Sequence, residues 1–254
     1  MALTKHEIPI LEYDDNPRAV LMPNRKNLYH FPEYAVFPFL EDEIDRFAAE
    51  HNCTKIGETV TVTKTYPIYE HLYKGKKIAL CQAPLGSSAA VQSLDFLIGY
   101  GCTKIISAGS CGALVDLPEN EFLVPVEALR DEGTSYHYLP PSRTVTLNER
   151  AVRAIETALR NNGVSYHKCK TWTTDGFYRE TKDMVEYRKE EGCSVVEMEC
   201  AGLAACAQFR GVTFGRMLYT ADSLANVEAH DDRGWGEGSM SAALKLCLDA
   251  VVDM

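Results

Sequence analysis

Two glutamates at an apolar junction are the first feature of this sequence with the chemistry of a binding site. Residues 194–211 read SVVEMECAGLAACAQFRG, which places Glu197 and Glu199 where an apolar strand should meet an apolar helix. A carboxylate in such surroundings requires a backbone amide, a basic side chain or a ligand as partner, because an unpaired buried charge is costly. Since residues two apart share one face of a strand, we expect at most one of the two to face a ligand.

A glycine-flanked serine forms the second candidate site. Gly109-Ser110-Cys111-Gly112 follows the apolar stretch KIISA and is expected to form a short turn. Its amides and the Ser110 hydroxyl have the groups that bind an anion, as backbone nests do. The alternative is a tight turn that only needs glycine dihedral angles. The motif has neither the third glycine of a dinucleotide fingerprint nor the lysine of a P-loop.

An aspartate and an aromatic pair complete the set of candidates. Asp222, in Thr220-Ala221-Asp222-Ser223, is either a cap of a turn or helix or a general acid. Phe177 and Tyr178 either pack in the core or stack on a flat heterocycle. The seven histidines show no metal-binding spacing, so no metal site is expected.

These side chains must be positioned by alternating strands and helices. Helix 146–162 should begin with a capping box, Thr146-x-x-Glu149, and Gly163 should end it in a left-handed conformation. The alternation predicts parallel strands joined by helical crossovers, with the candidate residues following strand ends at one edge of the sheet. The predicted strands are 77–83, 104–108, 122–129, 164–172, 194–196 and 212–219, and the predicted helices are 88–100, 146–162, 181–191, 201–209 and 239–251.

Composition restricts the class of protein. The 254 residues are 46% hydrophobic and 24% charged and contain no linker-like stretch, which predicts a single domain over residues 1–254. A formal charge of −10 disfavours nucleic acid or an anionic membrane as partner. Nine cysteines without a Cys-x-x-Cys pair, together with an N-terminus that has no apolar signal core, predict a reduced, cytoplasmic protein. No apolar run approaches membrane-spanning length.

The order of these pieces resembles the nucleoside phosphorylases of the uridine phosphorylase and hexameric purine nucleoside phosphorylase type. The likeness runs from about residue 19 to residue 225 and is carried by IISAGSCGAL, TTDGFYRE, VVEMECAG and YTADSLA. Residues 130–141, RDEGTSYHYLPP, resemble the uridine branch, whereas TDGFY and TADS resemble the purine branch. The resemblance implies an α/β fold, a three-layer α/β/α sandwich with a mixed central sheet.

The resemblance also implies a role for each matching position. Met198 and Glu199 would bind the ribose, with Glu199 holding its 2′- and 3′-hydroxyls. Ser110 would contact phosphate, and Phe177 would line the base pocket. Asp222 would contact the base and act as the catalytic acid that protonates a purine at N7. Arg25, in Pro23-Asn24-Arg25, would be the N-terminal phosphate-binding arginine.

The implied activity is that of a pentosyltransferase. Phosphate would be the co-substrate of a nucleoside, no cofactor would be needed, and the chain would form a homo-oligomer, either a trimer or a hexamer. In that family neighbouring subunits complete each site, and whether His6 is a donated group stays open. The base, purine or uridine, also stays open.

Two departures from the family concern the nucleophile. The phosphate loop at Met22–Arg25 is shorter than usual, and Ser107 stands where phosphorylases place a second phosphate-binding arginine. A guanidinium fork is difficult to replace in phosphate binding. Related nucleosidases, which use water, also lack that arginine, so a nucleosidase on the same scaffold is the alternative. A non-enzymatic nucleoside-binding or storage protein is the third reading.

Overall fold

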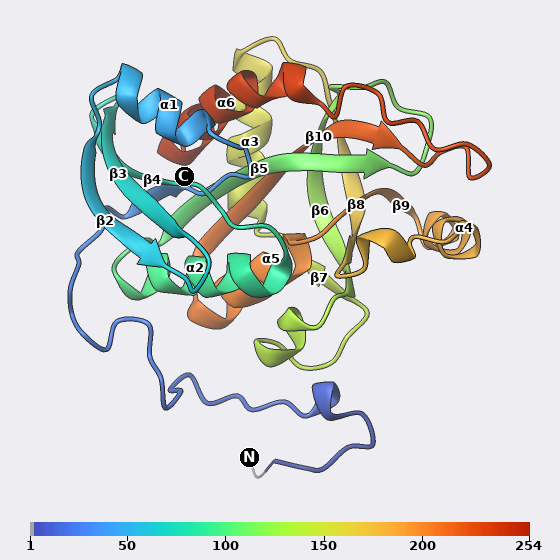
Figure 1. The fold of residues 1–254 in the computed structure, drawn as a ribbon, viewed down its shortest axis with the longest axis horizontal. Helices are drawn as coiled ribbons and strands as arrows, with labels where there is room; N and C mark the ends of the chain where they lie inside the picture. Colours follow the sequence, from blue (N-terminus) through green and yellow to red (C-terminus); the bar gives the residue numbers. More distant parts are fainter. Residues whose placement is uncertain (1–2) are drawn as a thin grey trace.

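A central mixed sheet organises the computed structural model, which describes residues 3–254 (Figure 1). Its strands lie in the order β10-β6-β8-β9-β5-β1-β4-β3-β2, with β7 paired to β6 and β10 also paired to β5. The expected α/β class with a mixed sheet is therefore confirmed. The strands are β1 Tyr34–Val36, β2 Thr54–Val60, β3 Thr65–Tyr73, β4 Lys76–Cys81, β5 Lys104–Ala113, β6 Phe122–Asp131, β7 Thr144–Thr146, β8 Tyr166–Thr174, β9 Cys193–Glu197 and β10 Thr213–Ser223.

Helices cover both faces of this sheet. In Figure 1, α1 (Glu43–Glu50), α3 (Glu149–Asn161) and α6 (Met240–Val252) lie on one side, and α2 (Ser87–Gly99) and α5 (Cys200–Arg210) lie on the other. Helix α5 is apolar around most of its circumference, because it is buried between α2 and the sheet. The remaining α-helix, α4 (Lys182–Glu190), packs against β9 away from these layers.

Five of the strands close into a ring. Strand β5 pairs with β9, β9 with β8, β8 with β6, β6 with β10, and β10 returns to β5. The interior holds a small apolar cluster to which each strand contributes one buried side chain. These side chains are Cys111, Leu123, Cys169, Val195 and Leu218. The ring fixes the relative positions of the ends of β5, β8, β9 and β10, which carry most of the candidate residues.

Two strands are longer than expected, and this changes the environment of two candidates. The Gly109–Gly112 motif is not a turn, because β5 continues through it to Ala113 and pairs with Val196 and Val195 of β9. Likewise, β10 extends to Ser223, so Asp222 lies within a strand and is not a cap. The glycines of the motif serve close packing, since a Cβ atom at Gly112 would lie 2.8 Å from Leu224 Cδ1 and 3.2 Å from Asp222 Oδ1.

The start of α3 also differs from the expectation. Thr146 ends strand β7, and the N-cap is Asn148, whose Oδ1 accepts hydrogen bonds from the amides of Arg150 and Ala151. The capping-box prediction was therefore wrong. Gly163, with φ of +67°, does follow the helix in the left-handed conformation.

The sequence patterns predict little of the first third of the chain, which contains α1 and strands β1 to β3. Residues 3–33 form no sheet strand, and most of this segment lies outside the layers (Figure 1), although Phe31 is buried in the core. Among the described residues, no helix has the length and apolarity needed to cross a bilayer. The treatment of residues 1–254 as one domain stays a prediction.

Candidate functional site

Glu197, at the end of β9, is held by the protein itself. Its Oε2 accepts hydrogen bonds from the amides of Glu199 (2.9 Å) and Cys200 (2.7 Å), and its Oε1 accepts one from the Thr173 hydroxyl at 2.6 Å. These amides belong to the first turn of α5, where unpaired N–H groups attract a carboxylate. Glu197 is thus used to join strand and helix.

Glu199, the N-cap residue of α5, uses its carboxylate differently. Oε1 accepts the amide of Gly86 at 2.7 Å, and Oε2 accepts from Arg216 Nη2 at 3.1 Å. The side chain makes no capping bond to its own helix. Burial raises the pKa of Glu199 to about 7, against the opposing effect of Arg216. Because each carboxylate oxygen accepts more than one hydrogen bond, Glu199 can still bind a diol.

Arg216 lies at the centre of this group. It comes from the middle of β10, is 1% exposed, and donates from Nη1 to the Ser107 hydroxyl at 3.1 Å. Its Nη2 also lies 3.6 Å from Glu197 Oε2, and its guanidinium stacks over the Phe39 ring at 4.4 Å from the centroid. The arginine therefore connects both glutamates to β5.

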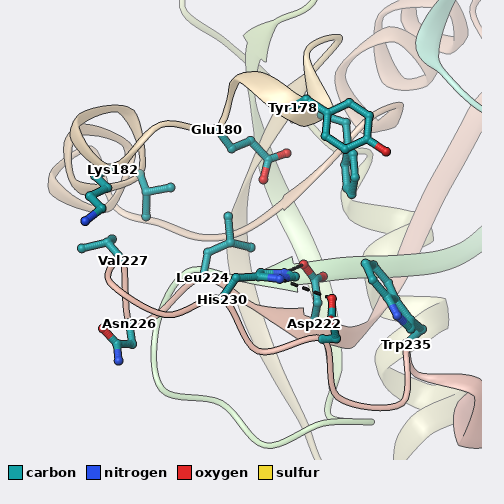
Figure 2. A pocket seen from close by; sticks show the side chains of 12 residues that line it. Tyr178, Glu180, Lys182, Asp222, Leu224, Asn226, Val227, His230 and Trp235 are labelled. Atoms are coloured by element: carbon teal, nitrogen blue, oxygen red, sulfur yellow. Dashed lines mark hydrogen bonds and ion pairs between the residues drawn. The ribbon is translucent and has the colours of Figure 1, made fainter.

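Asp222 is paired with a histidine. Its Oδ2 lies 2.7 Å from Nε2 of His230, and Figure 2 shows both side chains at the wall of one cavity. Asp222 is buried, whereas the His230 side chain is 45% exposed. The hydrogen bond to Asp222 raises the pKa of His230 above its ordinary value. This hydrogen bond favours the protonated imidazole, so the pair can hold a proton.

Two adjoining cavities bring most of the candidates together. Five of the six predicted site residues line the inner cavity of about 140 Å³: Ser110, Phe177, Met198, Glu199 and Asp222. The outer cavity, about 460 Å³, shares Phe177, Glu180, Asp222 and Trp235 with the inner one. Phe177 and Trp235 are partly exposed aromatic side chains, which suits the stacking of a planar ring.

Glu180 is an acidic group of the shared wall. Figure 2 shows its carboxylate pointing into the outer cavity on the side opposite to Asp222. Burial, followed by repulsion from Asp222, raises the pKa of Glu180 to about 7. At neutral pH this group is close to the midpoint of its titration, so it can accept or donate a hydrogen bond.

The structure does not bring Arg25 to these cavities. Pro23 and Asn24 lie beside Gly99, at the last turn of α2, and Arg25 donates to the carbonyl of Met22. Glu199 is bound by Gly86, at the opposite end of the same helix. A helix of this length spans roughly 18 Å. Within one chain, Arg25 and Ser110 therefore belong to different surfaces.

The segment that resembled the uridine branch folds onto itself. The guanidinium of Arg130 donates to the hydroxyls of Ser135 and Ser142 and to the carbonyls of Leu139 and Pro140. Arg130 is buried, and residues 130–141 are absent from the lining of both cavities. This segment organises a loop and does not contact the candidate site.

Sequence reasoning missed four residues of the site, namely Glu180, Arg216, His230 and Trp235. For Arg216 a signal existed, because one arginine interrupts the otherwise apolar strand 213–219 and a buried arginine requires partners. His230 and Trp235 lie in a loop after β10, and nothing in their spacing indicated that the loop returns to the sheet edge. Within residues 3–254, no group of three or more His, Cys, Asp or Glu side chains gathers as metal ligands would.

Comparisons with known proteins agree with this geometry. The model of the phosphorylase superfamily matches residues 33–253. A guanosine phosphorylase of Halorubrum lacusprofundi is 26% identical over 86% of this chain and 92% of its own. The structure of a uridine phosphorylase of Vibrio fischeri superposes with a TM-score of 0.77 at 22% identity, covering 92% of this chain and 95% of the other.

A nucleosidase shares the fold as well. The structure of an AMP nucleosidase of Bacteroides thetaiotaomicron superposes with a TM-score of 0.71 at 24% identity, covering 87% of this chain and 88% of the other. Fold similarity at this identity does not separate the two reactions. The family match covers every strand of the sheet and every residue of the two cavity walls, so this chain belongs to the phosphorylase superfamily.

Proposed function

We propose that this protein is a nucleoside phosphorylase that acts on purine nucleosides, releasing the free base and forming ribose 1-phosphate. One observation carries the proposal: Glu199, Met198, Ser110 and Asp222 line a single cavity, although they come from three different strand ends. This set can bind a ribose, an anion and a base next to one another. Phosphate serves as co-substrate, and the reaction needs no further cofactor.

The residues account for each part of the reaction. A phosphate oxygen attacks C1′ of the ribose as the C1′–N bond breaks, and the bonding electrons move to the base. Glu199 holds the 2′- and 3′-hydroxyls and fixes the sugar as positive charge develops on it. The proton held by the Asp222–His230 pair passes to N7 of the purine and neutralises the departing base. The bound substrate excludes bulk water from around Ser110, and this strengthens the hydrogen bond between the Ser110 hydroxyl and phosphate.

A purine is favoured over uridine by the wall of the cavity. Asp222 is hydrogen-bonded to His230 and lies at the position where an acid would protonate N7 of a purine, whereas uracil has no N7. The segment that resembled the uridine branch lies outside the cavity lining. The guanosine phosphorylase relative is consistent with this choice.

The nucleosidase reading is supported by Ser107, which stands where a phosphate-binding arginine was expected, and by the AMP nucleosidase that shares the fold. A storage or binding protein would need Glu199 but would not need an acid at Asp222. The test is to incubate the purified protein with adenosine, inosine, guanosine and uridine, each with and without phosphate. We expect free purine and ribose 1-phosphate only when phosphate is present. Phosphate-independent release of ribose would establish the nucleosidase.

The proposal includes a homo-oligomer in the cytoplasm. Leu85 lines the inner cavity and Tyr178 the outer one, yet they are 75% and 92% exposed, which suits a mouth covered by a second copy of the chain. The nine cysteines are free thiols, as a reducing compartment requires. A fully active species that sediments as a monomer would contradict the assembly.

A further inference from the structure

Arg216 has more hydrogen-bonding capacity than the protein uses. A guanidinium carries five N–H donors, and that of Arg216 makes two hydrogen bonds, to Ser107 and Glu199. Its Nε is buried and has no hydrogen-bond partner in the described structure. Buried polar atoms are normally paired, so a group with spare donors beside a cavity indicates a missing acceptor.

The position of Arg216 follows from the register of two parallel strands. In the β10–β5 pairing, Arg216 lies directly opposite Ser107, the position at which the family resemblance implied an arginine. Paired strands are about 4.8 Å apart, so side chains at the same register reach the same region. The short Ser107 side chain leaves the room that the guanidinium occupies and accepts a hydrogen bond from it at 3.1 Å.

Gly109 provides the remaining space. A Cβ atom at this position would lie 3.0 Å from Arg216 Nη2, so a larger residue would crowd the guanidinium. Beyond Gly109, the strand presents the exposed Ser110, which lines the same inner cavity as Arg216. The guanidinium of Arg216 and the hydroxyl of Ser110 therefore border one cavity, next to the ribose-binding candidate Glu199.

The two glutamates do not use up the charge of Arg216. Glu197 is already bonded to two amides and a threonine hydroxyl, and its contact with Arg216 is the longer one, at 3.6 Å. Glu199 has an acceptor site for Arg216 and one for the Gly86 amide, and its remaining lone pairs suit ribose hydroxyls. An anion that enters the cavity beside Glu199 would accept hydrogen bonds from the N–H groups of Arg216 that have no partner.

We infer that Arg216 binds the phosphate co-substrate together with Ser110, supplying from β10 the guanidinium that β5 lacks at Ser107. The inference rests on the proposed function and names the residue that holds its nucleophile. Arg216 would place one phosphate oxygen next to C1′ and, through its bond to Glu199, couple phosphate to the sugar. The loss of the arginine at position 107 would then be a relocation to the neighbouring strand and not a change to water as nucleophile.

The test is Arg216→Lys, with kinetics in both substrates. Lysine keeps the charge but loses the planar fork. We expect the KM for phosphate to rise about 10- to 100-fold, the loss typical of hydrogen bonds to charged groups, with a much smaller change in the KM for the nucleoside. Calorimetric titration with inorganic phosphate alone should show the same weakening. An unchanged KM for phosphate, with a raised KM for the nucleoside, would mean that Arg216 only positions Glu199 and would overturn the inference.

Arg188→Lys is the matched control. Arg188 is also buried, forms two 2.8 Å ion pairs and has an unpartnered Nε, but it pairs with Asp131 and Glu191 and lines neither cavity. Its replacement should lower the melting temperature and leave the KM for phosphate unchanged. In the double variant Ser107→Arg/Arg216→Ser, the arginine is moved from β10 to β5. This variant should recover part of the phosphate affinity that Arg216→Ser alone loses. If it recovers none, residues 107 and 216 do not place a guanidinium in the same region, which counts against the inference.

The phosphate dependence of the wild-type protein separates this inference from the proposed function. If the wild-type protein releases base at the same rate without phosphate, the phosphorylase assignment fails, whatever Arg216 does. If Arg216→Lys does not fold, Gly109→Ala takes its place, because the added methyl group crowds the guanidinium without removing its charge. The KM for phosphate should rise in that variant as well, and an unchanged value would overturn the inference.

Discussion

The backbone amide of Glu199 donates a hydrogen bond to the carboxylate of Glu197. Two glutamates at one strand–helix junction are thereby divided between two uses. Glu197 satisfies the first amides of α5 and two threonine hydroxyls, so its oxygens are occupied by the protein. Both glutamates line the inner cavity, but only Glu199 has acceptor capacity remaining, since among the described residues it accepts from Gly86 and Arg216 alone. That at most one of them faces a ligand stays a prediction.

Glu199→Gln should reduce kcat/KM far more than Glu197→Gln does. Glutamine keeps the size of the side chain, but charge-assisted hydrogen bonds are roughly twice as strong as neutral ones. Glu197→Gln should instead destabilise the fold by about 1–3 kcal/mol, because its amide group faces N–H donors. Activity and melting temperature should be measured on both variants. Equal losses of activity would mean that the ribose carboxylate is misassigned.

Asp222→Asn should keep the fold and lose about 10²–10⁴-fold in kcat on a purine nucleoside, the usual contribution of a positioned acid. The loss should be much smaller for a 7-methylated purine nucleoside, whose base leaves without protonation. His230→Gln should give a partial loss of the same kind, because His230 is the hydrogen-bond partner of Asp222 in the pair that holds the proton. Equal losses on both substrates would assign Asp222 to structure and reopen the pyrimidine reading.

Gly112→Ala should lower kcat without unfolding the protein. The added methyl group would lie 3.2 Å from Asp222 Oδ1 and 2.8 Å from Leu224 Cδ1, so it would displace the acid and the loop behind it. Overpacking of this kind costs about 1–3 kcal/mol. Gly238→Ala is the control, since its nearest contact, 3.2 Å away, is the side chain of Asn120. A Gly112→Ala variant with full activity would show that Asp222 tolerates displacement.

The pH dependence of stability should report on Glu199. Its pKa is about 7 in the folded protein because of burial and lies at its ordinary, lower value in the unfolded chain. Between these two values the folded state holds a proton that the unfolded state has released. The free energy of unfolding therefore falls as pH rises from about 4.5 to about 7. Glu199→Gln should reduce this slope and leave the part that Glu180 contributes, as followed by urea unfolding across that range, and an unaltered slope would contradict the assigned pKa.

Arg130→Lys should separate loop structure from base preference. The guanidinium of Arg130 holds four groups of the loop that resembled the uridine branch. Its replacement should lower the melting temperature by several degrees, as expected for a loss of about 1–3 kcal/mol in a chain of this size. The ratio of kcat/KM values for inosine and uridine should not change. A shift in that ratio would place the loop in substrate selection.

The alternation of apolar strands and helices from residue 77 onward predicted six strands of the sheet and the helices that follow them. It did not predict β1, β2, β3 or β7, and the mixed character of the sheet followed only from the family resemblance. Glycine patterns were less informative, because glycine permits a tight turn and also permits close packing against a strand. At Gly109 and Gly112 the second use holds, and only the neighbours Arg216 and Asp222 reveal it. These neighbours come from β10, about a hundred residues later in the chain.

The position of an arginine relative to the cavities follows for a related reason. The resemblance implies Arg25 as a phosphate-binding residue, but Pro23 and Asn24 lie beside the end of α2 that is remote from Glu199. Arg216 lies inside a strand that the local sequence does not mark as part of a site. Strand register decides which side chains share a site, and register is a property of long-range pairing that local sequence does not contain.

The closed ring of β5, β9, β8, β6 and β10 also determines which parts of the site can open. A strand in a closed ring has no free edge from which hydrogen bonds can be lost one by one, so its amides should exchange with solvent only when the whole protein unfolds. The loop 224–239, which carries His230 and Trp235, follows the end of β10 and should exchange orders of magnitude faster. Substrate would then enter and base would leave by movement of this loop, while the bond-breaking groups on the ring stay in place.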